Sequence, residues 1–167
     1  MEIRKSKITD LGSLVLLFDE ARATIAKLGI NQWQNGYPTE EDILKDIELQ
    51  QSYSVFEGER LVASFALITS GEPTYDCIYD GAWLTSAEYV AIHRVAIALS
   101  ERGKGIAPRI ISFAESLAKS LLRVSLKIDT HEGNLVMRKM LEKNGFSYCG
   151  VIFLENGEKR VAYEKII

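Results

Sequence analysis

A short glycine-rich segment, Arg102-Gly-Lys-Gly-Ile-Ala107, lies between a strand pattern and a helix pattern. The first N–H groups of a helix have no partners within the helix, and the aligned peptide dipoles place partial positive charge there. Glycine allows the chain to curl closely around an anion at such a helix start. Arg102 and Lys104 add two full positive charges. The segment therefore predicts a binding site for a phosphate group.

Two common phosphate-binding motifs do not fit this segment. The loop that binds nucleoside triphosphates needs Gly-Lys followed by serine or threonine, whereas Gly105 is followed by Ile106. The dinucleotide motif Gly-x-Gly-x-x-Gly can start at Gly103, but its third glycine would fall on Pro108. The sequence therefore excludes both of these nucleotide sites.

Two histidines are suited to accept a proton near neutral pH. His93 lies in the strand that leads into the loop, two residues before Val95, so strand alternation predicts that both face the same side. The alternative for His93 is a hydrogen-bonded structural role at a strand edge. His131, which follows a later strand, is the second candidate. The two histidines and two cysteines are widely spaced, so we expect no metal site.

The elements around the loop are readable from their periodicity. A helix begins at Ile106, and its apolar residues are spaced as one stripe that ends at Leu121. Pro108 falls in the first turn, where its missing N–H breaks no hydrogen bond. The preceding strand has two alternating faces, one with Val95, Ile97 and Leu99 and the other with Arg94, Ala96 and Ala98.

Strands and helices alternate along the rest of the chain, which predicts one mixed α/β domain over residues 1–167. A helix follows Thr9 or Asp10, and Thr39 caps a second helix. The remaining predicted helix runs over Asn134–Asn144, and the further strands over Glu2–Ile8, Ser52–Phe56, Leu61–Thr69, Arg123–Asp129, Phe146–Leu154 and Lys159–Ile166.

Three large aromatic residues lie in segments rich in turn-forming residues. Trp33 and Tyr37 belong to the segment 30–38, and Trp83 belongs to the irregular segment 70–86. Loops seldom carry such side chains without burying them. For Trp33 and Tyr37 we expect either the wall of a substrate pocket or a hydrophobic plug on the core, and Trp83 is a further candidate for lining such a pocket.

Charge, apolar runs and cysteine content indicate which partners and which compartment the protein has. The formal net charge of −3 gives no indication of a nucleic-acid surface. Apolar runs are too short to span a membrane, and the first residues lack the apolar core of a signal peptide. The two cysteines fit free thiols in a reducing cytoplasm. We therefore expect a cytoplasmic protein with no nucleic-acid or membrane partner.

The sequence resembles the GNAT superfamily of N-acetyltransferases. That family's acetyl-CoA loop reads Gln/Arg-x-x-Gly-x-Gly/Ala, matched here by Arg102, Gly105 and Ala107. A second family motif, Asn-x-x-Ala-x-x-Leu-Tyr-x-x-x-Gly-Phe, is matched at Asn134 and at Gly145-Phe146. The predicted order of elements also follows the family over almost the whole chain. The resemblance implies a central mixed, mostly antiparallel sheet, flanked by about four helices and splayed at the acetyl-CoA site.

The resemblance also implies an activity and its residues. A primary amine of a small molecule or peptide would attack acetyl-CoA directly in a ternary complex, without a metal ion. Asn134 would contact the pantetheine arm or orient the acetyl group, and the resemblance leaves a homodimer open. The implied acetyl-CoA contacts are Val95, Ala96 and Ile97 for pantetheine, and Arg102, Gly103, Lys104, Gly105, Ile106 and Ala107 for the pyrophosphate.

Two departures from the family pattern affect the expected chemistry. Leu141 stands where many relatives have a tyrosine thought to protonate the departing thiolate, so another group or water would do this, or the thiolate would leave unaided. The strand over Val90–Leu99 lacks the glutamate that serves many relatives as the base, which leaves His93 for that role. The alternative to an enzyme is an acyl-CoA-binding sensor or interaction module with little or no turnover.

Overall fold

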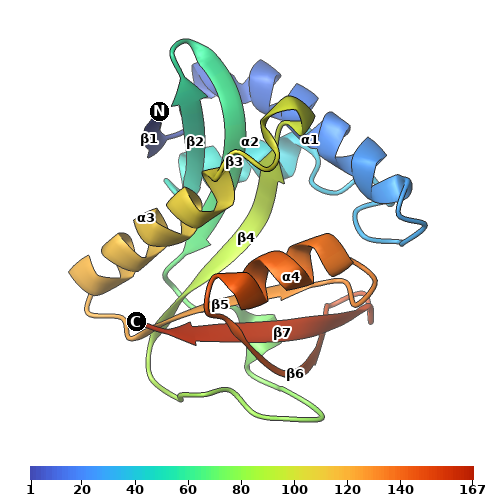
Figure 1. Ribbon diagram of the computed structural model, residues 1–167, viewed down its shortest axis with the longest axis vertical. Coiled ribbons are helices and arrows are strands. Elements are labelled where there is room, and N and C mark those ends of the chain that lie inside the picture. The colour runs from blue at the N-terminus through green and yellow to red at the C-terminus, as the bar shows by residue number, and fades with distance from the viewer. The chain divides into compact units, whose positions relative to one another are not determined.

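Seven strands and four α-helices alternate along the chain (Figure 1). The computed structural model describes residues 1–167. The helices are α1 (Leu11–Ala26), α2 (Glu40–Glu48), α3 (Ile106–Ser120) and α4 (Leu135–Lys143). The strands are β1 (Glu2–Lys5), β2 (Ser52–Glu57), β3 (Arg60–Ile68), β4 (Tyr89–Ile97), β5 (Ser125–Thr130), β6 (Ser147–Phe153) and β7 (Lys159–Ile166).

The strands are hydrogen-bonded in the order β1-β2-β3-β4-β5-β7-β6. The pairs β1–β2, β2–β3, β5–β7 and β6–β7 are antiparallel, whereas β4–β5 is parallel. A parallel pair needs a crossover connection, and α3 supplies it between β4 and β5. These findings confirm the predicted mixed, mostly antiparallel sheet with four helices.

The chain divides into two compact units. Unit 1 contains Met1–Leu67 and Arg94–Ile110, and unit 2 contains Ile68–His93 and Ile111–Ile167. The boundary between the units passes through β4 and through α3, so each unit contains part of both elements.

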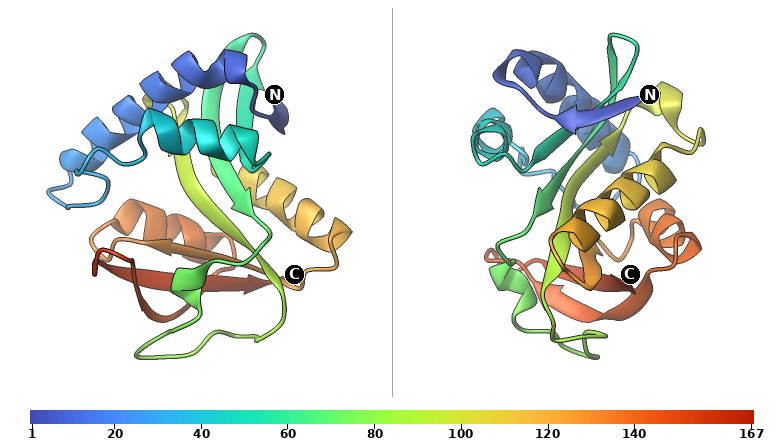
Figure 2. Two further views of the ribbon diagram at one scale, coloured as in Figure 1. Left: turned by 180° about the vertical axis from the view of Figure 1, so that it is seen from behind. Right: turned by 90° about the vertical axis from the view of Figure 1, so that its left-hand side faces the viewer.

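In unit 1, α1 and α2 cover the same face of the strands (Figure 2). Thr39 caps α2 as predicted, because its hydroxyl accepts the N–H of Asp42 while the Asp42 carboxylate accepts the N–H of Thr39. Ala96 of β4 is buried in this core, and Ala98, which follows the strand, packs against it. The buried cluster consists of Leu14, Leu17, Phe18, Ala21, Ile43, Ile47 and Ala96.

In unit 2, the two faces of β5 and β7 have different neighbours. Tyr163 of β7 contacts Arg138 and Glu142 of α4, whereas the next residue, Glu164, contacts the segment before β4. The side facing that segment is polar, because Lys127 pairs in register with Glu164. In unit 2, one face of this strand pair therefore contacts α4, and the other, polar face contacts the segment before β4.

Three local predictions were wrong. Strand β4 ends at Ile97, and Leu99 is 51% exposed in a short 3₁₀ turn, so it does not extend the face of Val95. Arg94 has a φ of 52°, which interrupts the alternation of β4. The rule that placed His93 and Val95 on one side therefore does not apply across Arg94. Leu121 lies beyond the end of α3 and is 41% exposed.

Candidate functional site

The glycine segment is an exposed turn that opens directly into α3. Gly103 and Gly105 have φ angles of +77° and +81°, which a residue with a side chain adopts only with strain. A Cβ atom at either position would meet nothing within 4 Å, so the space beside the turn is open. Arg102 and Lys104 are exposed next to these glycines. The turn therefore has the backbone conformation, access and charge that an anion site needs.

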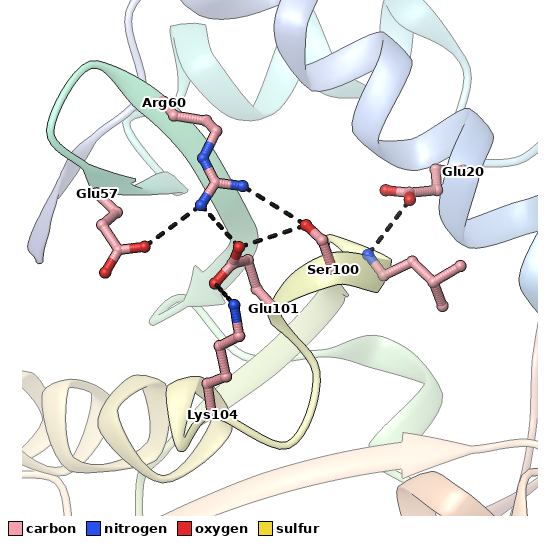
Figure 3. Close-up of polar contacts among 7 residues, drawn as sticks. Glu20, Glu57, Arg60, Ser100, Glu101 and Lys104 are labelled. Atoms are coloured by element: carbon pink, nitrogen blue, oxygen red, sulfur yellow. Dashed lines mark hydrogen bonds and ion pairs between the residues drawn. The ribbon is translucent and has the colours of Figure 1, made fainter.

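A buried carboxylate lies directly before this turn (Figure 3). Glu101 is 3% exposed, and its oxygen Oε1 accepts a hydrogen bond from Nη2 of Arg60 at 2.7 Å. Its other oxygen, Oε2, lies 3.1 Å from Nζ of Lys104. These hydrogen bonds, first from Arg60 and then from Lys104, hold the pKa of Glu101 below its ordinary value. The cation of Lys104 is thus already paired within the protein.

Strand β4 leads into the turn with a mixture of buried and half-buried residues. Ala96 is 2% exposed in the core of unit 1, while Val95 and Ile97 are half-buried. The turn after Ala98 is tied to α1, since the N–H of Leu99 donates to Oε1 of Glu20 at 3.3 Å. These contacts fix the strand end from which the glycine turn starts.

Arg94 holds its left-handed position in β4 through two partners in unit 1. Its Nη2 donates to Oδ1 of Asp46 on α2 at 2.7 Å, and its Nη1 donates to the hydroxyl of Tyr37. Burial raises the pKa of Tyr37. Trp33 packs against the unit 1 core and meets the ring of Phe18 edge-on, with the centroids 5.9 Å apart. These contacts favour the plug for Trp33 and an anchor for Tyr37, and a role of either in substrate binding stays a prediction.

In unit 2, His93 pairs with a carboxylate that the sequence did not indicate. Its Nε2 lies 3.2 Å from Oε2 of Glu72, and the side chains are 17% and 22% exposed. Burial raises the pKa of Glu72, but the pairing with His93 and two hydrogen bonds from Thr74 outweigh this effect and lower the pKa to about 2. Glu72 is therefore a carboxylate at neutral pH, placed to orient the imidazole.

Tyr75 lies beside this pair. Its ring centroid is 5.7 Å from that of His93, and its hydroxyl donates to Oδ1 of Asp129 at 2.6 Å. Burial and then the charge of Asp129 raise the pKa of Tyr75 well above its ordinary value. Glu72 is held from the other side, because its N–H donates to the hydroxyl of Tyr89 at 3.0 Å. The environment of His93 is therefore aromatic and acidic.

The side chain of Trp83 makes contacts within the protein. Its Nε1 donates to the carbonyl of Tyr75 at 2.8 Å. Nζ of the buried Lys127 lies 4.3 Å from the ring centroid of Trp83 and 4.1 Å from that of Tyr89. Burial lowers the pKa of Lys127. The cation–π contacts use one face of Trp83 to hold residues 69–88, and its role as a substrate wall stays a prediction.

The other predicted residues of unit 2 lie around the start of α4. His131 accepts the N–H of Gly133 through Nδ1 at 3.0 Å, which closes a turn. Asn134 caps α4, since its Oδ1 accepts the N–H of Met137 at 3.2 Å. Leu141 is fully buried and is a core residue. His131, Asn134 and Leu141 each therefore have a structural role. The catalytic role of His131 and the binding role of Asn134 stay predictions.

The structure adds two general findings. No group of three or more His, Cys, Asp and Glu side chains is arranged to hold a metal ion. None of the helices is both long enough and apolar enough to cross a membrane.

Sequence reasoning missed Glu72 and Glu101, and the reasons differ. Glu72 precedes Pro73 and Thr74, a pattern that predicts the start of a short turn, but nothing local indicates His93 as its partner. Glu101 reads as an ordinary surface charge next to the glycine turn. Its burial depends on Arg60, which is 41 residues away in the sequence.

Comparisons with known proteins agree on one family. The model of the GNAT acetyltransferase family matches residues 21–146. A GNAT family acetyltransferase structure from Streptococcus agalactiae is 38% identical, with a TM-score of 0.88 over 99% of this chain and 95% of its own. No curated protein matches the sequence.

Two more distant structures share the fold. A GNAT family acetyltransferase from Listeria monocytogenes is 22% identical, with a TM-score of 0.74 over 99% of this chain and 94% of its own. The PaiA N-acetyltransferase of Thermoplasma acidophilum, solved in complex with coenzyme A, is 19% identical, with a TM-score of 0.73 over 99% of this chain and 98% of its own.

Proposed function

The chain belongs to the GNAT acetyltransferase family, and on that premise we propose that it is an N-acetyltransferase acting as one domain over residues 1–167. Acetyl-CoA supplies the acetyl group as a thioester, and a primary amine of a small molecule or peptide accepts it in a ternary complex. The acceptor class, a primary amine, rests on the family resemblance. The individual amine is left to experiment, because acceptor-binding segments differ most among proteins that share a fold.

The observation that carries this proposal is the glycine turn before α3. Gly103 and Gly105 hold left-handed conformations with open space beside them, at the start of a 15-residue helix. This turn fits the pyrophosphate of CoA, which would accept hydrogen bonds from N–H groups of the segment Arg102–Ala107. In the free protein the N–H groups of Arg102 and Lys104 donate to the carbonyls of Leu99 and Glu101, both at 3.4 Å. The CoA complex of the Thermoplasma acidophilum protein, which has the same fold, supports the choice of ligand.

We assign the chemistry to β4 and its neighbours. An N–H near Ala96 or Ile97 would donate to the acetyl carbonyl and stabilise the negative charge that develops there. His93 would accept the proton of the amine, with Glu72 holding Nε2 so that Nδ1 stays available. His131 is the second candidate for the base, and Asn134 would contact the pantetheine arm or the acetyl end.

A base is needed because the amine attacks only in its neutral form. A lysine-type amine with a pKa near 10.4 is almost fully protonated at pH 7, and neutralising it costs about 4–5 kcal/mol. The cost for an α-amino group with a pKa near 8 is about 1 kcal/mol. The acidic surroundings of His93, with Glu72 and Asp129 close to Tyr75, would attract such a cationic amine.

A sensor that binds acyl-CoA without turnover is the second candidate, and Leu141 favours it. The family's usual proton donor is absent at this position, and the leucine is fully buried. However, thiolate is a tolerable leaving group, because a thiol has a pKa near 8.5.

The protein is further proposed to work in the cytoplasm. Both cysteines are free, with Cys77 exposed and Cys149 buried, as expected for a reducing compartment.

The test is release of CoA thiol from acetyl-CoA across a panel of alkylamines, aminoglycosides, amino acids and peptide N-termini, at several pH values. We expect release with one class of amine, and loss of the neutral-pH rate in His93→Ala. Binding of acetyl-CoA without release across the panel would support the sensor, and absence of binding would refute both functions.

A further inference from the structure

We propose that Glu101 is an internal competitor for the phosphates of CoA, and that it weakens CoA binding by holding Lys104. The inference rests on the proposed placement of the CoA pyrophosphate at Arg102–Ala107. The residues Arg102–Ala107 provide the affinity for CoA, and Glu101 would adjust that affinity.

Each carboxylate oxygen of Glu101 contacts a different cation. Arg60, at the start of β3, binds Oε1 at 2.7 Å, and Lys104 binds Oε2 at 3.1 Å (Figure 3). Ser100 adds a third contact to Oε1 at 3.3 Å. One guanidinium is already enough to pair with one carboxylate. Lys104 is therefore a second cation on an anion that has a partner without it.

Lys104 is also the partner that can leave. Its side chain is 60% exposed, whereas that of Glu101 is 4% exposed and fixed in place. A lysine is a compact charge on a flexible stem, so it can exchange one anion for another by rotating its side chain. Lys104 lies between Gly103 and Gly105, two residues of the segment where we place the pyrophosphate. On this basis Lys104 pairs with Glu101 in the free protein and turns to a phosphate when CoA binds.

The exchange has a predictable consequence for affinity. Lys104 must give up its contact with Glu101 before it contributes to CoA binding, so only the difference between the two contacts is gained. This exchange raises the Kd of CoA and favours release of the product.

The decisive variant is Glu101→Gln, which keeps the shape of the side chain and an oxygen for Arg60 but removes the charge. We expect the Kd of CoA, measured by calorimetry at 0.15 M salt, to fall about two- to fivefold, the size expected for an exposed ion pair. In the double variant Glu101→Gln/Lys104→Met this gain should disappear. The matched control is Glu57→Gln, because Glu57 also contacts Arg60, at 3.4 Å, but does not contact Lys104. Its Kd should equal that of the wild type.

A second measurement uses the wild-type protein and does not depend on the folding of a variant. The side-chain carboxyl ¹³C signal of Glu101 should shift when CoA is added, because the carboxylate loses Lys104. The carboxyl signal of Glu57 should stay in place. A Glu101 signal that does not respond to saturating CoA would overturn the exchange.

The remaining outcomes separate this inference from the proposed function. Unchanged or weaker CoA binding by a folded Glu101→Gln variant would mean that Glu101 only supports the turn. A gain that persists in Glu101→Gln/Lys104→Met, or that Glu57→Gln reproduces, would show a general effect of charge and would also overturn the inference. If the wild type and every variant fail to bind CoA, the proposed function fails as well.

Discussion

The pairing of Glu72 with His93 predicts a specific dependence of stability on pH. Replacing Glu72 by glutamine removes the charge but keeps an oxygen that can accept the hydrogen bonds from Thr74. In the wild type, burial opposes the charged form of Glu72, but His93 and Thr74 outweigh it and lower the pKa from 4.5 to about 2. Between these two pH values the unfolded chain binds more protons at this position than the folded protein does.

The size and sign of the effect follow from this difference. Lowering the pKa from 4.5 to about 2 corresponds to about 3 kcal/mol of stability. This contribution is fully present above pH 4.5 and is lost as the pH falls towards 2, so it decreases by about 2 kcal/mol between pH 5 and pH 3. Glu72→Gln cannot lose it, because the glutamine does not titrate.

Urea denaturation of both proteins between pH 3 and pH 7 measures this difference. The contributions of all other carboxyl groups cancel when the two free energies of unfolding are subtracted. Glu59→Gln, which changes an exposed glutamate in the turn between β2 and β3, is the matched control and should follow the wild type. If the difference between wild type and Glu72→Gln does not change with pH, the pairing of Glu72 with His93 is refuted.

Three further predictions concern binding, packing and catalysis. Gly105→Glu should raise the Kd of CoA at least about a hundredfold, because it places a carboxylate in the turn. Gly157→Glu, at a position with the same φ of +81° and equally open space, should bind CoA normally in the same calorimetric titration. Equal losses of affinity in the two variants would show that backbone strain alone is responsible. Leu141→Ala should lower the free energy of unfolding by about 3 kcal/mol in urea, because it leaves a cavity at a fully buried position; a cost below about 1 kcal/mol would contradict the packing of α4. His93→Ala should reduce kcat about a hundredfold or more at neutral pH with little change in the KM for acetyl-CoA, while His131→Ala should keep most of its rate; the reverse order would identify His131 as the base.

Much of the fold was predictable because the relevant signals are local. Thr39 and Asp42 form a capping box within four residues. Gly103 and Gly105 favour the left-handed conformation that both adopt in the turn. The order of elements predicted from periodicity and two separate motifs both matched the GNAT family. The family model and the Streptococcus agalactiae structure confirmed that assignment.

The parts that could not be predicted depend on partners far apart in the sequence. Arg94 is not a glycine, yet it adopts a φ of 52° in the middle of β4, supported by Asp46 and Tyr37. Alternation therefore failed at the point where β4 was expected to align His93 with Val95. The choice between pocket wall and plug for the aromatic residues also needed tertiary contacts, because both alternatives call for the same residue types.

We proposed that this protein transfers an acetyl group from acetyl-CoA to an amine. The most direct test incubates the wild type with ¹³C-acetyl-CoA and the amine panel, and measures the acetylated product by mass spectrometry together with free CoA thiol. We predict equal amounts of N-acetylated amine and CoA from one class of amine, with no product from Gly105→Glu. CoA release without a labelled amine product would contradict the proposed transfer, and product formation that is unchanged in Gly105→Glu would contradict the proposed pyrophosphate site.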